Sequence, residues 1–141
     1  MRRIMLFMVV LAMMLASIPA WADSGRPLEA ALAAANETDG GDVGASGHAW
    51  VRLNQGQNQV CFAIEANDLT TPAVAAHIHK APAGVNGGVV VNFDVANNGL
   101  SGCVSADEGL IKDIRQNPWD YYVNVHNPTK PTGAIRGQLS K

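Results

Sequence analysis

The sequence predicts a mostly β protein, an antiparallel β-sandwich or barrel with one short helix. Three observations lead to this fold class. About seven or eight short segments alternate apolar and polar residues, as strands with one buried face do. Gly, Pro, Asn and Asp separate these segments roughly every eight to twelve residues. A single segment, over residues 105–117, instead carries apolar residues at helical spacing.

Residues 1–22 are expected to be a secretory signal peptide and not part of the fold. Arg2 and Arg3 precede an apolar run over residues 4–18, and residues 20–22 (Ala-Trp-Ala) have the small-x-small pattern of a cleavage site. The apolar run is short for a membrane span, and a retained membrane anchor is the alternative. We therefore expect a secreted or periplasmic protein with no stable membrane anchor after cleavage.

Residues 23–47 are expected to supply an N-terminal strand and a loop that lead into the domain. Leu28, Ala30 and Leu32 alternate with other residues, as in an entry strand. The alanine-rich stretch over residues 30–35 equally fits one helical turn. Residues 36–47 are polar and rich in Gly and Asp, which indicates a loop.

Further strands are expected wherever apolar and polar residues alternate. They fall at residues 48–53, 59–66, 74–79, 89–94, 100–104, 119–126 and 134–139. Polar turn residues at 54–58 indicate that the first two of them form a hairpin. Within the strand at 74–79, Val74, Ala76 and Ile78 are expected to face the core, so that His77 and His79 face away from it.

The helix is expected to begin at a capping box formed by Ser105 and Glu108, which fit the pattern S-x-x-E. Leu110 and Ile114 follow at helical spacing, so one side of the helix is apolar. Pro118 ends the element because proline cannot continue a helix.

Cys61 and Cys103 are the two cysteines of the chain. In an exported protein an even pair is expected to form a disulfide. Such a bond closes a loop of roughly 40 residues, which the chain-entropy model values at about 4 kcal/mol. Two buried thiols, or one thiol that binds a metal, are the alternatives.

The four histidines are the candidate functional residues. His77 and His79 are two positions apart in one expected strand, so both side chains point to the same face. His126 ends a second expected strand and His48 begins a third. Imidazole ligands without thiolate favour copper(II) or zinc. We therefore expect that His77 and His79, together with His126 or His48, could bind one copper or zinc ion.

The alternation also supports an interpretation without a metal. Asn124, Arg136 and Gln138 lie on the same non-core side of their expected strands as the histidines. The histidines could then belong to a structural polar network, with hydrogen bonds to carbonyls or to Asp and Asn side chains. Solvated histidines without a role are the simplest alternative.

Composition excludes several classes of function. The formal net charge is −2 and no Lys/Arg cluster is present, which argues against nucleic acid or an anionic membrane as a partner. All five methionines lie within the first 14 residues, so a Met-rich copper site is excluded from the rest of the chain. No nucleophile elbow, P-loop or H-E-x-x-H motif is present, and we expect a protein that is not an enzyme.

Several motifs together resemble the CHRD domain family, named for chordin and found in many exported bacterial proteins. They are Ala75-Ala76-His77-Ile78-His79, Gly84-Val85-Asn86-Gly87, Tyr121-Tyr122-Val123-Asn124-Val125-His126 and Gly133-Ala134-Ile135-Arg136-Gly137-Gln138-Leu139. The likeness extends over residues 27–139. It implies a secreted, immunoglobulin-like or similar β-sandwich, and little about mechanism. His48 departs from the family pattern, in which a small or hydroxyl residue is expected.

The His77-Ile78-His79 segment also resembles the H-x-H strand of copper–zinc superoxide dismutase, another β-barrel with one disulfide. The further histidines and the acidic cluster needed for two metals are missing. Three hypotheses follow. The first is a non-catalytic exported binding module with a surface histidine site. The second is a structural or adhesive module with an extracellular protein partner. The third is a mononuclear copper enzyme of the dismutase type.

Overall fold

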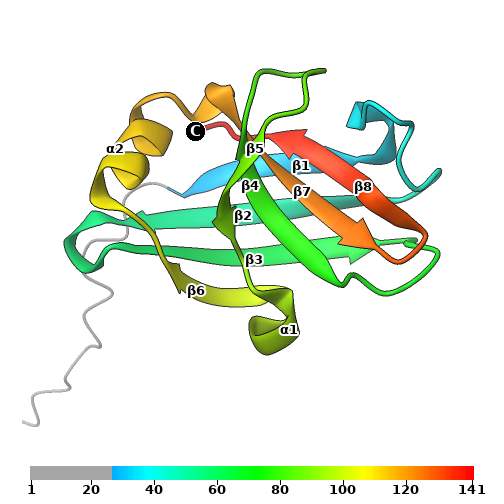
Figure 1. Cartoon of the computed structure of the whole chain (residues 1–141), viewed down its shortest axis with the longest axis horizontal. Helices are drawn as coiled ribbons and strands as arrows, with labels where there is room; N and C mark the ends of the chain where they lie inside the picture. Colours follow the sequence, from blue (N-terminus) through cyan, green and yellow to red (C-terminus); the bar gives the residue numbers. More distant parts are fainter. Residues whose placement is uncertain (1–26) are drawn as a thin grey trace, which may run out of the picture.

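The computed structural model of the chain describes residues 27–141 (Figure 1). The expected signal peptide at residues 1–22 lies outside the described residues. The described residues form eight strands: β1 Leu28–Ala33, β2 Ser46–Asn54, β3 Gln59–Asn67, β4 Ala75–Lys80, β5 Gly88–Asn92, β6 Ser101–Ser105, β7 Tyr121–Asn127 and β8 Lys130–Gln138. Every strand pair is antiparallel, and the predicted fold class is confirmed.

The strands form one sheet in the order β5-β4-β7-β8-β1-β2-β3-β6. The sheet bends between β8 and β1, which are paired only through Ala33 and Arg136. Its two halves then cross, and Figure 1 shows β4 and β7 passing over β2 and β3. The apolar faces of the halves enclose the core, which includes Val51, Val60, Ile78, Val123 and Ile135, all fully buried.

Phe62 and Phe93 help to close the side of the sheet opposite this bend. Phe62 belongs to β3 and Phe93 directly follows β5, and their rings stack with centroids 4.2 Å apart. The aromatic contact joins β3, the neighbour of the end strand β6, to the residue that follows the other end strand, β5. The sheet is therefore nearly closed, although β5 and β6 are not paired with each other.

The predicted helix is α2, Glu108–Gln116, which buries Ile111 and Ile114. Its predicted N-cap is wrong. The cap is Asp107, whose side chain accepts a hydrogen bond from the backbone N–H of Leu110. Ser105 still belongs to β6, where it pairs with Gln59, so its backbone is not available to begin the helix.

Four shorter helical elements accompany α2 in the described part of the chain. They are α1 Val95–Asn98 and the 3-10 turns η1 Ala34–Asn36, η2 Gln55–Gln57 and η3 Pro118–Asp120. The alanine-rich stretch thus divides into the end of β1 and the turn η1. Within residues 27–141, no helix has the length and apolarity needed to span a membrane.

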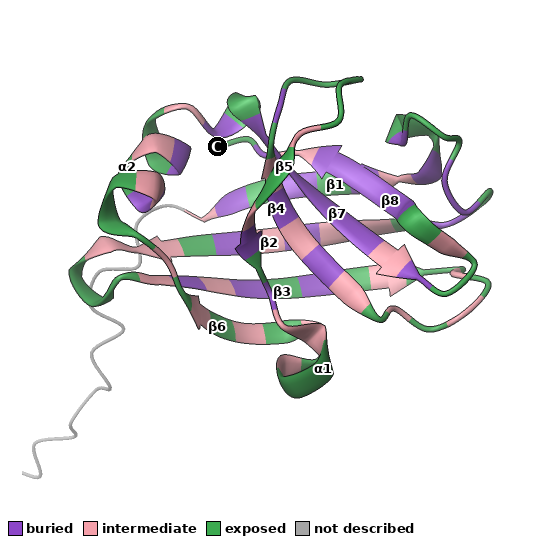
Figure 2. Cartoon of the chain, in the orientation of Figure 1, coloured by how far each residue is buried: buried purple, intermediate pink, exposed green. Residues whose placement is uncertain are grey.

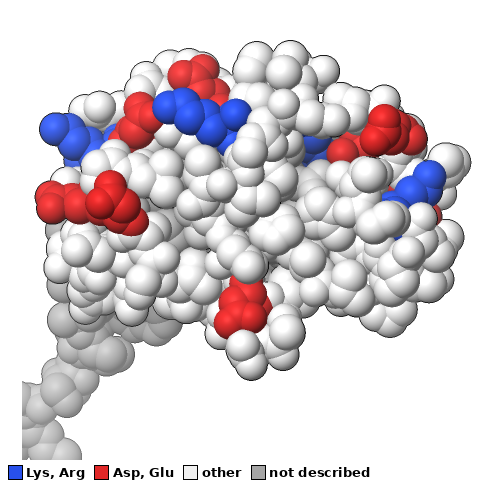
Figure 3. Space-filling model, viewed as in Figure 1, with Lys and Arg blue, Asp and Glu red and all other residues white. Residues whose placement is uncertain are grey.

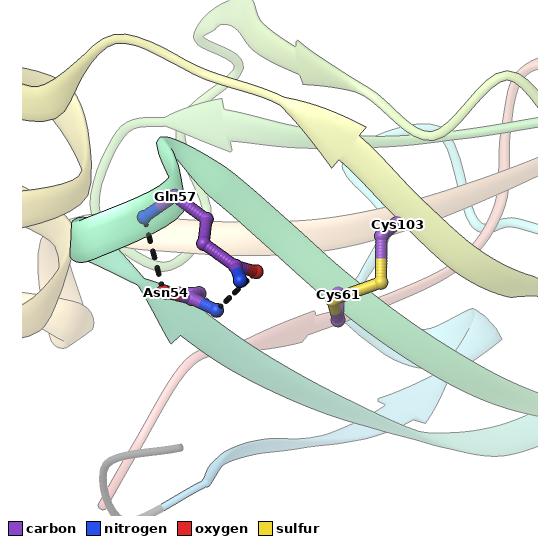
Figure 4. The surroundings of a disulfide bond; sticks show 4 residues. All are labelled: Asn54, Gln57, Cys61 and Cys103. Carbon is purple, nitrogen blue, oxygen red and sulfur yellow. Dashed lines mark hydrogen bonds between the residues drawn. A yellow bond between two sulfur atoms is a disulfide. The ribbon is translucent and has the colours of Figure 1, made fainter. Parts of the chain in front are cut away.

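The predicted disulfide is confirmed. Cys61 on β3 and Cys103 on the edge strand β6 face each other directly and are bonded (Figure 4). The predicted hairpin turn beside it is also present. The Asn54 side chain accepts a hydrogen bond from the Gln57 backbone N–H and donates one to the Gln57 side chain.

The outer face of β4, β7 and β8 is more buried than alternation predicts. Tyr122 and Asn124 are each 3% exposed and Arg136 is 1% exposed, although all three face away from the apolar core. Figure 2 shows buried residues in succession along β7 and β8. Val74, expected in the core, is instead 53% exposed and precedes β4. A second, polar interior therefore lies outside the sheet.

Charged residues on the face shown in Figure 3 lie in small groups of both signs. Lys80 and Asp113 form an ion pair, with 2.6 Å between Nζ and Oδ2. Asp113 also accepts hydrogen bonds from Tyr121 and Asn117. These contacts attach α2 to β4 and β7, which is a structural role.

Candidate functional site

Three of the four histidines converge on the outer face of β4 and β7. His77 and His79 come from β4, and His126 comes from β7, where it is paired with Ala75. One ring nitrogen from each residue lies within 4.8 Å of the other two. The register explains the contact of two of them, because His126 lies opposite Ala75 and is therefore a diagonal neighbour of His77, within reach of its ring. His79 lies two positions further along β4, on the same face. The three imidazoles could hold a metal ion.

His77 and His126 are in direct contact. The Nδ1 atom of His77 lies 3.1 Å from Nε2 of His126, which is hydrogen-bonding distance. His126 Nδ1 lies 3.0 Å from the carbonyl oxygen of Pro131. A carbonyl only accepts, so Nδ1 of His126 carries the proton and its Nε2 has a lone pair. His77 therefore donates its Nδ1–H to His126 in this arrangement.

His79 is oriented in the same way as His126. Its Nδ1–H donates to the carbonyl oxygen of Gly87 at 2.9 Å. The Nε2 atom of His79 is buried and has no hydrogen-bond partner among residues 27–141. An unsatisfied lone pair in a buried position is costly. This atom is thus free to accept a proton or bind a metal.

Burial holds all three imidazoles in the neutral form. It lowers the pKa of His77 to about 4, and any positive charge on His126 or His79 adds to this effect. Burial also lowers the pKa of His79 and of His126, against the opposing effect of their bonds to carbonyls. A neutral imidazole is the form that binds metals. Neutral imidazoles would therefore be available to a metal ion at neutral pH.

A stack of side chains supports His79 from β7 and β8. The ring of Tyr122 is stacked on His79, with centroids 4.8 Å apart and 6° between the planes. The guanidinium of Arg136 lies 3.4 Å from the centroid of the Tyr122 ring. Both contacts are favourable, the second as a cation–π interaction. The stack fixes the plane of the His79 ring.

The loop over residues 81–87, called the β4–β5 loop below, covers this stack. Arg136 donates to the carbonyl oxygens of Pro82 and Val85, at 3.0 and 2.8 Å, and to Oδ1 of Asn86 at 3.3 Å. Gln138 donates to the carbonyl oxygen of Ala81 at 2.7 Å. The two polar residues of β8 therefore hold the loop whose last residue, Gly87, orients His79.

Asn124 and Glu37 form the other side of the polar interior. Asn124, paired with His77 across the strands, donates its side-chain N–H to a carboxyl oxygen of Glu37. Burial raises the pKa of Glu37 to about 7, although the positive charge of Arg136 opposes the rise. A Cβ at Gly133 would lie 2.5 Å from both carboxyl oxygens of Glu37, so a glycine is needed there to make room.

His48 does not join the cluster. It lies on β2, in the other half of the sheet, where it contacts Trp50 and its Nε2 is 3.3 Å from a carboxylate oxygen of Glu29. Asn124, Arg136 and Gln138, also expected on this side, lie on β7 and β8 next to the cluster. Asn124 pairs with His77, Arg136 with Asn124 and Gln138 with Tyr122, and none of the three belongs to the cluster itself.

Sequence reasoning missed Tyr122, Glu37 and Gly87. Tyr122 shares the parity of Asn124 and His126, so its side of the strand was predictable, but its ring was not assigned to the site. Glu37 lies in a segment expected to be a loop and carries no local signal. Gly87 acts through its backbone carbonyl, and no local sequence signal indicates that role either.

A comparison with protein-family models gives a match to the model described as CHRD domain, over residues 28–139. Among curated proteins and among solved structures, none matches the chain. The family match covers nearly all of the described residues, including the three clustered histidines, their supports and the disulfide.

Proposed function

The chain belongs to the CHRD domain family, and from this premise we propose that it is an exported, non-catalytic binding module that holds one copper or zinc ion. The ligands are His77, His79 and His126. The observation that carries the proposal is the convergence of three imidazole nitrogens within 4.8 Å, with Nε2 of His79 unsatisfied among the described residues.

The surroundings of two rings support metal binding. A histidine that binds a metal through one nitrogen commonly donates the other N–H to a carbonyl, which fixes its tautomer and direction. His79 does so to Gly87, and His126 does so to Pro131. Both Nε2 lone pairs are thereby prepared as ligands. For His77 to bind through Nδ1, its proton must move to Nε2.

Metal binding would require the three ring nitrogens to move slightly closer together. Two nitrogens bound to one tetrahedral zinc stand about 3.4 Å apart, since each lies about 2.0–2.1 Å from the ion. His77 and His126 are already 3.1 Å apart, whereas the whole set extends up to 4.8 Å. Small ring rotations on β4 and β7 bring the three together.

The donor set narrows the choice of metal. The thiols of Cys61 and Cys103 are bonded to each other, so thiolate is excluded as a ligand from these two residues. Three neutral imidazoles suit copper(II) and zinc.

The disulfide and the membership of an extracellular family are compatible with secretion, and we propose that the protein resides in the periplasm or outside the cell.

The same contacts favour one competing function, a structural or protein-binding module without a metal. The hydrogen bond between His77 and His126 joins β4 to β7 by itself, and the other ring contacts hold Gly87 of the β4–β5 loop and Pro131 at the start of β8. In that case the histidines stabilise the outer face that a protein partner would contact.

Calorimetric titration of copper(II) and zinc(II) into the protein lacking residues 1–22 tests the proposal. One ion should bind with saturation, and the His77→Ala/His79→Ala double variant should lose binding. The His48→Ala variant is the matched control, because His48 lies outside the cluster, and it should bind as the wild type does. If the wild-type protein is well folded and binds neither ion, the metal proposal is wrong and the structural function remains.

A further inference from the structure

A cavity lies beside the histidine cluster, over β8. It has a volume of about 310 Å³ and is lined by Ala35, Asn36, Ala83, Gly84, Arg136 and Gln138. In Figure 1 the β4–β5 loop (green) and the segment after β1 (blue to cyan) both rise beside β8. A hydrogen bond of 2.8 Å from Asn86 to Thr38 joins these two segments. The volume is in the range of sites for small ligands.

Arg136 is a buried cation without a counter-ion. Its side chain donates to two backbone carbonyls and one amide oxygen, all of them neutral. No carboxylate of residues 27–141 lies within 4.0 Å of its guanidinium. Glu37 acts on it only at longer range, and the hydrogen bond that Glu37 accepts comes from Asn124. A buried charge is stabilised when an opposite charge pairs with it.

The hydrogen-bond donors of Arg136 indicate which kind of counter-ion would pair with its guanidinium. The planar guanidinium is charged and has five N–H donors, which carboxylate oxygens accept well. Nη2 donates both of its hydrogens, to Pro82 and Val85, and Nη1 donates one to Asn86. The Nε–H and one Nη1–H remain, so a carboxylate that enters the cavity lined by Arg136 would accept single hydrogen bonds and not the two-donor fork, which needs Nη2.

The amides of the cavity offer acceptors. Both hydrogens of Gln138 Nε2 are engaged, by the carbonyl oxygens of Ala81 at 2.7 Å and Trp119 at 2.8 Å, which leaves Oε1 to accept. Asn36 donates its side-chain N–H to the carbonyl oxygen of Arg136 at 2.9 Å, which leaves its own Oδ1. A ligand with a hydrogen-bond donor next to its carboxylate could donate to one of these two amide oxygens. A hydroxyl suits this place better than an ammonium, because Arg136 repels a second cation.

We propose that this cavity binds a small hydroxycarboxylate, with Arg136 pairing its carboxylate and the amide oxygen of Gln138 or Asn36 accepting from its hydroxyl. The site shares no residue with the histidine cluster. Ligand binding there can therefore be tested without metal, although Arg136 also supports His79 through the Tyr122 ring.

L-lactate is the probe, added to ¹⁵N-labelled protein without metal and followed by NMR. Signals of the Arg136 Nε–H and of the Gln138 and Asn36 side-chain amides should shift together and saturate at one equivalent bound. Acetate, which lacks the hydroxyl, should bind at least several-fold more weakly. Methyl lactate, which lacks the charge, should not bind.

A cavity-filling variant avoids disturbing Arg136. Ala83 is exposed at the cavity wall, so Ala83→Phe should fill the space, leave the fold intact and weaken lactate binding at least ten-fold. Ala96→Phe is the matched control, an exposed alanine on α1 outside the cavity, and should bind as the wild type does. The proposal is overturned if lactate fails to saturate these signals, if methyl lactate binds equally well, or if Ala83→Phe leaves the affinity unchanged.

Discussion

His77 on β4 and His126 on β7 are joined directly through their rings, with 3.1 Å between Nδ1 of the first and Nε2 of the second. The two residues are 49 positions apart in the sequence. Their contact places one proton between two ring nitrogens, in a position that a metal ion would take instead. Under the proposed function, the protonation of this pair and of His79 controls metal binding.

The metal affinity of the cluster is expected to persist to lower pH than the affinity of an exposed histidine site. An exposed imidazole is protonated as the pH falls through about 6.5, and protons then displace the metal. Burial lowers the pKa of His77 to about 4, and also lowers the pKa of His79 and His126. Zinc affinity measured by calorimetry should change little between about pH 7.5 and 6, beyond buffer effects. A steep loss centred at pH 6.5 would contradict this prediction.

Gly87→Ala is expected to weaken metal binding. A Cβ at this position would lie 2.1 Å from the carbonyl oxygen of Lys80, so the backbone must move and carry away the carbonyl that orients His79. Loss of such a supporting contact typically costs about 10–100-fold in metal affinity. Gly88→Ala is the matched control, because a Cβ there meets nothing within 4 Å. Equal affinities of the two variants would show that the loop does not position His79.

The strands and their faces were predictable because alternation is a local signal. A side chain's face in a strand follows from its parity alone, so Ile78 in the core and His77 outside it could be assigned from the sequence. The helix was predictable from its spacing, although its first residue was not. Both Ser105 and Asp107 can cap a helix, and only the pairing of Ser105 with Gln59 in β6 decides between them.

The composition of the cluster and the burial of the outer face depend on strand order, which local patterns do not contain. His126 joins His77 because β7 lies next to β4, whereas His48 is on a strand of the other half. Arg136 is buried because it holds the β4–β5 loop, through contacts 50–54 residues away in the sequence. Asn124 meets Glu37 over 87 residues. Parity alone therefore predicts exposed side chains at positions that distant segments of the chain in fact cover.

The corrected helix cap gives a direct test on stability. Asp107→Ala should lower the free energy of unfolding by about 1 kcal/mol, because the Leu110 N–H loses its partner. Ser105→Ala removes the residue expected to be the cap from an exposed position in β6 and should have a much smaller effect. Urea unfolding of both variants distinguishes the two residues.

The disulfide is expected to stabilise the fold without affecting the cluster. The bond joins residues 42 positions apart, and the chain-entropy model gives about 4 kcal/mol for a loop of this length. Cys61→Ala/Cys103→Ala should therefore unfold at a markedly lower urea concentration. Its zinc affinity under folding conditions should equal that of the wild type, since the hydrogen bonds that orient the three histidines involve no residue of β3 or β6. Reduced zinc binding by the folded variant would link the two sites.

Glu37 is expected to lower stability as the pH rises. Burial raises its pKa to about 7 in the folded protein, whereas an unfolded chain has the ordinary value near 4.5. The folded state therefore binds more protons between these values, and the contribution of Glu37 to stability decreases from about pH 4.5 to about pH 7. The amide of Glu37→Gln keeps an acceptor for Asn124 but cannot ionise.

Histidine protonation acts in the same pH range with the opposite sign, so the comparison must be made between variant and wild type at each pH. The difference in unfolding free energy, Glu37→Gln minus wild type, should increase from pH 4.5 to 7 and stay constant above. The histidine contribution cancels in this difference, because both proteins keep the cluster. Glu65→Gln is the control, because it makes the same chemical change at an exposed position on β3, outside the polar interior. A flat difference for Glu37→Gln would mean that its carboxyl titrates as it does in the unfolded chain, and that the polar interior of the outer face is open to water.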